Sequence, residues 1–261
     1  MRYALRPVLA ALILATPIDS AQAAKVLMFG GAGSTGSQVA KHLVARVDDV
    51  VVFVRPPSDR TKLNGLKVEF VTGDVNDAPS VAAAFSRVRP DYVVSTMQDR
   101  PGEKTPHGDG DGHIAAAAKA SGVKQVLVVS SIAAAVVDGT DADRATLPDI
   151  NFKAFAHIIR EKAAGERKLI ESGVPYTIIR IGALIVERGK PMHPGTGQGY
   201  LTDKRVMGPI TYPDLGRLMF DCVGADRCMN KIFYATDDSL DAEYKNWRCR
   251  RFAKDPDKEC G

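Results

Sequence analysis

The stretch VLMFGGAGSTG, residues 26–36, decides the fold of this chain. Its first four residues form an unbroken apolar run, which is typical of a strand buried in a parallel sheet. Gly30, Gly33 and Gly36 then follow in a Gly-x-x-Gly-x-x-Gly spacing. The first glycine lets the chain turn off the strand, the second lets the backbone approach a pyrophosphate, and the third lets the next helix pack closely on the sheet. The stretch predicts a dinucleotide site, and the alternative is a glycine turn kept for packing alone.

The helix that follows the turn is expected to begin at Ser34 and Thr35. Its first N–H groups lack partners within the helix, and the helix dipole places positive charge at that end. A phosphate group is therefore expected beside Ser34 and Thr35, and the position in a strand-turn-helix unit makes the glycine pattern more specific than it is alone.

Strand-like and helix-like segments alternate along the chain as far as residue 181. We expect strands at 26–29, 50–54, 68–71, 92–96, 125–130 and 176–181, and helices at 34–46, 79–88, 113–121 and 152–172. This alternation predicts a Rossmann-like α/β fold, a doubly wound parallel sheet with helices on both faces. After Gly182 the pattern loosens, and only a helix at 211–223 and a strand at 231–235 are expected. Residues 24–261 are interpreted as a single domain, in which 182–261 contribute a small C-terminal substrate lobe.

Residues 1–23 have the pattern of a secretory signal peptide. Arg2 and Arg6 precede a short apolar core, and Ala21 and Ala23 form an Ala-x-Ala cleavage signal. The apolar core is about half the length that a membrane-spanning helix needs. The pattern predicts an exported protein, periplasmic or secreted, with no membrane span in the mature chain. The alternatives are an uncleaved anchor and a misassigned start.

All four cysteines lie within the last forty residues, at Cys222, Cys228, Cys249 and Cys260. An even number of cysteines in an exported chain predicts two disulfides. Three pairings are open, and short-range closure favours Cys222–Cys228 with Cys249–Cys260. Four thiols in a reducing compartment are the alternative.

The composition is that of an ordinary globular protein. Apolar residues make up 45% of the chain and charged residues 25%, and the net charge is only +4. No long run of Lys or Arg occurs, which argues against nucleic-acid binding.

Arg55 ends the second expected strand, where an enzyme that uses NAD usually has an acidic residue for the ribose hydroxyls. A cation at this point suits a 2′-phosphate. The sequence therefore favours NADP over NAD as the cofactor, although NAD is possible if Arg55 is merely a solvated residue.

Several further stretches resemble the atypical short-chain dehydrogenase/reductase superfamily, and in particular its NmrA-like, NAD(P)H-binding branch. They are the glycine turn, Gly73-Asp74-Val75, AAKASGVK at 117–124, Ser130-Ser131 after an apolar strand, and ESGVPYTIIR at 171–180. The resemblance covers residues 26–236. It implies that Asp74 and Val75 lie beside the adenine, that Ser95, Thr96 and Met97 follow the dinucleotide, and that Ser130 and Ser131 lie near the nicotinamide.

Reductases of this superfamily use a Tyr-x-x-x-Lys pair on the helix after the fifth strand. Lys162 is present here, but Ile158 stands four residues before it, so the usual acid is missing. A literal match at Tyr200 and Lys204 falls after the sixth strand and is interpreted as a chance match. Ser131 and Lys162 are thus the catalytic candidates, and Lys162 is also expected to contact the cofactor.

The segment HGDGDGH, residues 107–113, alternates carboxylates and imidazoles with glycine. Its spacing matches neither a calcium loop nor a zinc helix, so we expect a mobile loop that ends in a helix cap, and no metal.

Three functions remain open from the sequence. The first is an NADP(H)-dependent oxidoreductase of an unidentified small molecule, without the usual tyrosine. The second is a non-catalytic NAD(P)-binding sensor or assembly factor with a protein partner, and the third is an epimerase or dehydratase.

Overall fold

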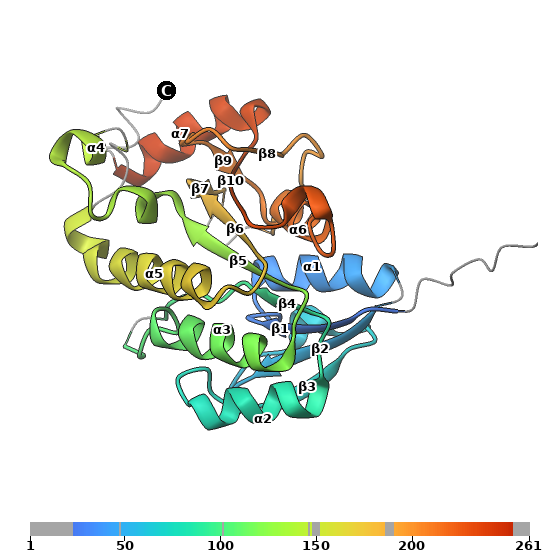
Figure 1. Ribbon diagram of the computed structural model, residues 1–261. Helices are drawn as coiled ribbons and strands as arrows, with labels where there is room; N and C mark the ends of the chain where they lie inside the picture. The colour runs from blue at the N-terminus through green and yellow to red at the C-terminus, as the bar shows by residue number, and fades with distance from the viewer. Residues whose placement is uncertain are drawn as a thin grey trace, which may run out of the picture.

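The computed structural model describes residues 23–46, 48–100, 102–145, 147, 152–185 and 191–252. Except for Ala23, the predicted signal peptide lies outside these residues. The described chain forms a central sheet with helices on both faces (Figure 1).

The strands are β1 (Lys25–Phe29), β2 (Asp49–Val54), β3 (Glu69–Thr72), β4 (Tyr92–Ser95), β5 (Gln125–Ser131), β6 (Tyr176–Ile181), β7 (Ala183–Leu184), β8 (Tyr200–Thr202), β9 (Pro209–Ile210) and β10 (Lys231–Thr236). The α-helices are α1 (Ser34–Ala45), α2 (Ala78–Val88), α3 (Asp109–Ser121), α4 (Asp141–Ala145), α5 (Phe152–Ser172), α6 (Tyr212–Phe220) and α7 (Asp241–Phe252). The expected strands and helices up to residue 181 are all present, with ends shifted by a few residues.

The main sheet has the strand order β3-β2-β1-β4-β5-β6-β10-β8. Its strands run parallel except for β8, which pairs antiparallel with β10. The chain moves outward in one direction from β1 to β3 and in the other from β4 onward, so the strand order reverses between β1 and β4. In sheets of this kind, ligands bind at the carboxyl ends of the strands that flank this reversal. The predicted Rossmann-like fold is confirmed.

The two faces of the sheet explain the unbroken apolar run of β1. Leu27 and Phe29 point into one core, beneath α2, α3 and α5, whereas Val26 and Met28 point into a second core, beneath α1 and α6. Because neighbouring residues of a strand face opposite ways, a strand covered on both faces needs apolar side chains at every position.

The C-terminal segment is closely joined to the main sheet. β10 is the seventh strand of the main sheet, and α6 packs along α1. β7 and β9 pair with each other in a small second sheet, and α7 lies at the top of the view in Figure 1. The short strands β7, β8 and β9 and the helix α7 were not expected from the sequence.

One expectation was wrong in the segment 107–113. Helix α3 begins at Asp109 instead of His113, and its first turn contains Asp109 and Asp111. Acidic side chains stabilise the first turn of a helix through its dipole. His107 and Asp111 are buried, so this segment is part of the packed structure and not an exposed loop.

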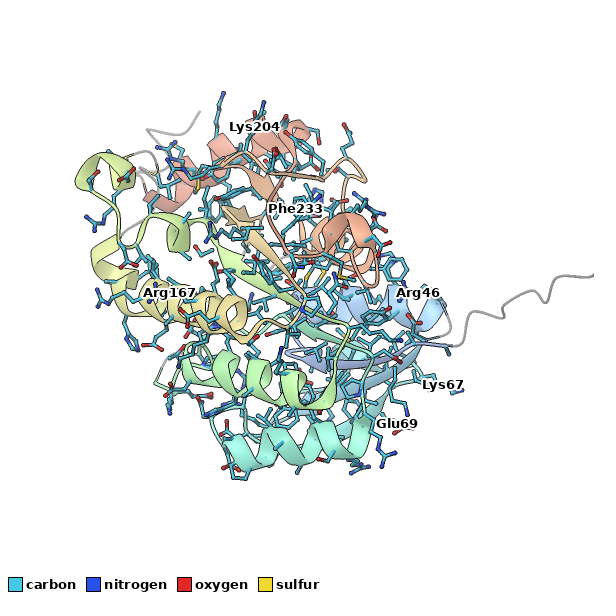
Figure 2. All side chains as sticks on the ribbon, viewed as in Figure 1. Arg46, Lys67, Glu69, Arg167, Lys204 and Phe233 are labelled. Carbon is cyan, nitrogen blue, oxygen red and sulfur yellow. A yellow bond between two sulfur atoms is a disulfide. The ribbon has the colours of Figure 1, made fainter. Side chains whose placement is uncertain are left out.

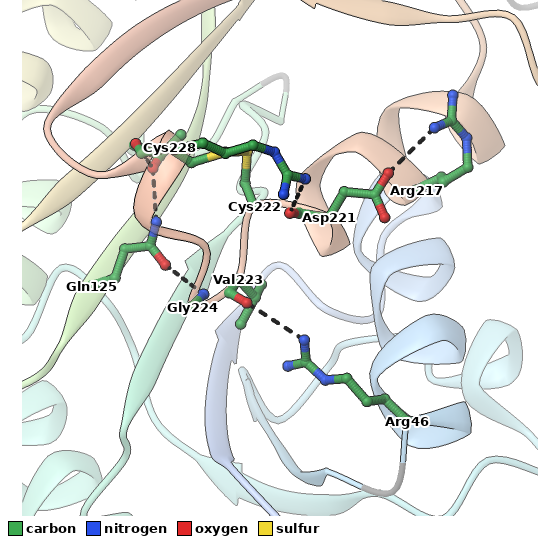
Figure 3. The surroundings of a disulfide bond; sticks show 10 residues. Arg46, Gln125, Arg217, Asp221, Cys222, Val223, Gly224 and Cys228 are labelled. Carbon is green, nitrogen blue, oxygen red and sulfur yellow. Dashed lines mark hydrogen bonds and ion pairs between the residues drawn. A yellow bond between two sulfur atoms is a disulfide. The ribbon is translucent and has the colours of Figure 1, made fainter. Parts of the chain in front are cut away.

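A disulfide joins Cys222 and Cys228 just after α6, which confirms that predicted pairing (Figure 3). Hydrogen bonds hold the loop that it closes. The side chain of Arg46, at the end of α1, donates to the carbonyl of Val223, and the side-chain carbonyl of Gln125 accepts from the N–H of Gly224. Cys249 is also disulfide-bonded, and its predicted partner Cys260 lies outside the described residues.

The packing of α6 on α1 predicts a cost for any side chain at Gly216. A Cβ atom there would overlap Cβ of Gln38 and approach the N atom of Val39 to 3.2 Å. We expect Gly216→Ala to lower the free energy of unfolding by about 1–3 kcal/mol, the usual cost of overpacking. Urea denaturation of the purified protein measures this change.

Gly112 in α3 is the matched control for that substitution. A Cβ atom there would meet only the outer part of the Lys168 side chain, which can move aside. Gly112→Ala should therefore be neutral or stabilising by up to about 1 kcal/mol, the difference in helix propensity. Equal effects of the two substitutions would contradict the packing argument.

Candidate cofactor site

A cleft of about 340 Å³ opens at the carboxyl ends of β1, β2 and β4, where the strand order reverses. Residues from the glycine turn, from the ends of β2 and β3, and from the segment after β4 line it. Among the residues predicted to bind the cofactor, Gly30, Gly33, Ser34, Arg55, Asp74, Val75, Thr96 and Met97 contribute to this lining. Thr35, Gly36, Ser95, Ser130, Ser131 and Lys162 are not part of it.

The three glycines of the turn have different roles. Gly30 has a φ of 75°, and a Cβ atom there would lie 2.7 Å from the carbonyl carbon of Thr96. At Gly36 a Cβ atom would lie 2.6 Å from Cα of Gly31. At Gly33 the single close neighbour would be the carbonyl oxygen of Gly30, at 3.1 Å. Gly30 and Gly36 therefore permit the fold itself, whereas Gly33 keeps the cleft open.

The start of α1 is suited to an anion. Gly33 is its N-cap, no side chain caps the helix, and no acidic residue lies in the first turn. The first N–H groups of the helix therefore have no side-chain acceptor. Because Gly33 and Ser34 line the cleft, these groups and the helix dipole can hold the diphosphate of a dinucleotide.

Arg55 lines the cleft, as do Ser58 and Lys62. Its guanidinium forms an ion pair with Glu103, from the segment that follows β4. Glu103 also lies 3.9 Å from Arg100. The sequence did not reveal that Arg55 has a carboxylate partner, because the two residues are 48 positions apart.

Thr96 fixes the other side of the turn. Its hydroxyl donates to the carbonyl of Gly30 over 3.1 Å, and its own N–H donates to the carbonyl of Phe29. These bonds hold the segment after β4 against the glycine turn. Ser95, one residue earlier, is buried beneath this wall.

Tyr212 lies beside the cleft, at a position that the sequence did not reveal. It begins α6, and its hydroxyl forms side-chain hydrogen bonds with Gln98 and Ser34, both of which line the cleft. Burial raises the pKa of Tyr212, and the two hydrogen bonds oppose that rise. The start of α6 was predicted, but only the packing of α6 on α1 brings this hydroxyl to the glycine turn.

Ser130 and Ser131 end β5 and face opposite sides of the sheet. The side chain of Ser131 accepts a hydrogen bond from the N–H of Ala133 and so caps the short helix at 132–136. The hydroxyl of Ser130 is buried and has no hydrogen-bond partner among the described residues. The two serines therefore do not act as one unit.

Lys162 lies on α5, and its Nζ atom is 2.8 Å from Nε2 of His107. Nδ1 of His107 is 3.1 Å from a carboxylate oxygen of Asp111. Burial lowers the pKa of Lys162, and the negative charges of Asp111, Asp99 and Glu166 oppose that fall. Lys162 is therefore held in a polar cluster behind the cleft wall.

The Tyr200–Lys204 match lies elsewhere. Tyr200 is on the edge strand β8, is 40% exposed, and donates to a carboxylate oxygen of Asp238 over 2.9 Å. That hydrogen bond raises the pKa of Tyr200. Lys204 is exposed at the top of the view in Figure 2. Neither residue lines the cleft.

Neither a metal site nor a membrane-spanning helix occurs in the part of the chain that the structure describes. Its His, Cys, Asp and Glu side chains form no group of three or more that could hold a metal ion. None of its helices combines the length and apolarity needed to cross a membrane.

The geometry of the turn predicts different outcomes at two glycines. Gly33→Val places a branched side chain at the open side of the turn, so dinucleotide binding should fall below detection while the fold persists. Gly36→Ala forces backbone atoms apart and should destabilise the protein by about 1–3 kcal/mol. Calorimetric titration and circular dichroism of both variants separate the effects. Retained binding in a natively folded Gly33→Val variant would place the site elsewhere.

Comparison with known proteins agrees with this geometry. The family model described as NAD(P)H-binding matches residues 30–226. An uncharacterized chloroplastic protein of Arabidopsis thaliana is 31% identical over 181 residues, which covers 61% of this chain and 53% of that protein. Sanguinarine reductase of Eschscholzia californica is 28% identical over 205 residues, covering 64% of this chain and 71% of the reductase. The chain spans about half the length of the first curated relatives that it matches.

Among solved structures, the anaerobilin reductase ChuY of Escherichia coli superposes with a TM-score of 0.67 at 24% identity. The superposition covers 82% of this chain and 98% of ChuY, and at this identity it supports the fold alone. The family match covers most of the chain, including the glycine turn, and confirms the resemblance noted from the sequence. The chain belongs to the NAD(P)H-binding family.

Proposed function

We propose that this protein is an NADP(H)-dependent oxidoreductase that reduces a small molecule at the end of the cleft near Thr96 and Met97. It would do so without the usual catalytic tyrosine, because Ile158 stands one helical turn before Lys162. The observation that supports the cofactor choice most directly is the position of Arg55 on the cleft wall. Family membership supports the broader class, because it gives an NAD(P)H-binding protein.

Arg55 supports NADP(H) for an electrostatic reason. A 2′-phosphate near Arg55 could form paired hydrogen bonds with the guanidinium, which fits phosphate geometry well. Lys62 lies on the same wall and adds positive charge. In this structure the Arg55 guanidinium is paired with the Glu103 carboxylate, so a 2′-phosphate must displace that carboxylate. A phosphate carrying more than one negative charge can do so, whereas a neutral ribose hydroxyl gains less from the exchange.

The reduced nicotinamide supplies a hydride to the substrate, and the protein must supply a proton. Ser131 and Lys162 are our candidates for that role. The Ser131 side chain accepts from Ala133, and its own hydroxyl hydrogen remains available to donate. An ammonium whose pKa is lowered, as at Lys162, gives up its proton more readily than an ordinary lysine does.

Oxidation of NADPH in the presence of carbonyl compounds and quinones tests whether the protein turns over. Consumption that depends on a substrate supports the oxidoreductase. Tight NADPH binding without consumption against a broad panel favours the non-catalytic sensor or assembly factor instead.

Binding affinities of variants at the Arg55–Glu103 pair test the cofactor choice. Arg55→Asp should weaken NADPH binding by about tenfold or more and leave NADH binding nearly unchanged, because a hydrogen bond to a charged group contributes about 1.5–3 kcal/mol. Glu103→Gln should strengthen NADPH binding by up to about fivefold, the scale of an exposed ion pair. Calorimetry with both cofactors measures these changes. Equal affinities of the unmutated protein for NADPH and NADH contradict the proposal.

We also propose that the protein is exported after cleavage following Ala23. The signal-peptide pattern and the disulfide support this, since disulfides persist in oxidising compartments. The intact mass of protein purified from its native cells should lack the first 23 residues and four hydrogen atoms. Four thiols that react with an alkylating agent before reduction would count against export and bridging alike.

A further inference from the structure

Behind the cleft wall, α3 and α5 enclose a cluster of ionisable side chains. It consists of Asp99, His107, Asp111, Lys162 and Glu166, from three segments of the chain. His107 is 2% exposed and Asp111 7%. Charged groups are rarely buried unless they are paired, and such clusters occur often at functional sites.

The contacts define the hydrogen-bonding state of His107. An ammonium can only donate, so Nε2 of His107 must accept from Lys162 across the 2.8 Å contact. Nδ1 then carries the hydrogen of the neutral ring and donates to Asp111 over 3.1 Å. The order Asp111, His107, Lys162 is thus a chain in which each side chain orients the next.

A glycine in α5 makes room for this chain. A Cβ atom at Gly165 would overlap the Asp111 carboxylate oxygen that faces His107. Glycine in a helix interior lowers helix stability by about 1 kcal/mol relative to alanine. Its presence at this position is explained by the close approach of the Asp111 side chain to the backbone of α5. Asp111 is therefore seated against the backbone of α5, one turn from Lys162.

The cluster reaches the cleft through Asp99. This residue lines the cleft, and its carboxylate lies 3.5 Å from Nε2 of His107. Pro106, next to His107 in the chain, lines the cleft as well. The Lys162 ammonium therefore lies behind the part of the cleft wall that Asp99 forms, with His107 beside it.

We propose that His107, held by Asp111, positions the Lys162 ammonium as the proton donor of the reduction. This rests on the proposed oxidoreductase function. With NADPH bound, the nicotinamide would supply the hydride for the new C–H bond of a reduced carbonyl, and the electron pair of the C=O double bond would move to oxygen. That oxygen takes a proton that comes from Nζ of Lys162 and crosses the cleft wall at Asp99, because Lys162 itself does not line the cleft. The neutral amine regains a proton from water after the product leaves.

The surrounding charges set the direction of the expected pH effects. Asp99 after β4, Asp111 on α3 and Glu166 on α5 favour the ammonium, and Glu166 is itself paired with Arg180. Burial favours the neutral amine. Removing the charge of Asp111, or the acceptor at His107, must therefore lower the pKa of Lys162 further.

The experiment compares Asp111→Asn and His107→Leu with the unmutated protein, and uses His157→Gln, an exposed residue of α5, as the control. The donor is competent only below its pKa, so kcat should fall as the pH rises through that value. In both variants this basic limb should move down by about one pH unit or more, and the dissociation constant for NADPH should stay within about twofold. His107→Gln, which keeps an acceptor oxygen, should restore part of the shift. The control should change nothing.

A readout without turnover comes from NMR titration of the lysine side chains, with Lys162→Met to assign the signal. The Lys162 titration should move down in the same two variants. An unmoved titration, or a uniform loss of kcat at every pH, overturns the positioning role. A titration that moves while no carbonyl is reduced contradicts the proposed function and leaves the coupling of His107 to Lys162 standing.

Discussion

The close approach of two backbone segments at the glycine turn is the constraint on which the rest of this structure depends. The main chain of Gly30 lies against that of Thr96, and Gly36 lies against Gly31, at distances that leave no space for a side chain. The hydroxyl of Thr96 bonds to the carbonyl of Gly30 and holds this arrangement. Because β1 and β4 are adjacent, the same contact fixes the start of α1 above the point where the strand order reverses.

Once α1 is placed, the C-terminal segment has a defined position. Gly216 lets α6 pack directly on α1, whose first residue, Ser34, lines the cleft. Tyr212 then reaches Ser34, 178 positions earlier in the sequence. The disulfide-closed loop after α6 is tied back to Arg46 at the far end of α1 and to Gln125 in β5. The C-terminal segment therefore packs against the same helix, α1, that forms one side of the cleft.

The sequence was sufficient for whatever depends on local pattern. Apolar runs and the glycine spacing predicted β1 to β6, α1 and α5. Each of these elements is covered by neighbouring helices or strands, and the apolar residues that this burial requires are visible in its own sequence. The pairing of Arg55 with Glu103, the hydroxyl of Tyr212 and the burial of His107 depend on contacts between distant segments, so no local pattern reveals them. The start of α3 was placed too late because glycine and aspartate at 108–112 suggest a turn, whereas the aspartates here stabilise the first turn of a helix.

The two faces of the sheet differ in a way that bears on the chemistry. Beneath α1 and α6 the core is mainly apolar. Beneath α5, near the carboxyl ends of the strands, Glu166 and Arg180 form an ion pair that Tyr234 joins by a hydrogen bond. Burying a charged pair stabilises a protein little compared with apolar side chains of similar size, because both ions lose their hydration.

Stability alone therefore does not account for this buried ion pair beneath α5. The pair is part of a charged layer that continues from Arg180 and Glu166 through Lys162 to His107. Glu166 and Lys162 are one helical turn apart, so they share a face of α5. The ion pair with Arg180 holds the Glu166 carboxylate toward the sheet, and this keeps negative charge near the Lys162 ammonium. The charged layer beneath α5 thus provides an electrostatic setting for a lysine behind the wall of the cofactor cleft, which an apolar core of the same volume could not provide.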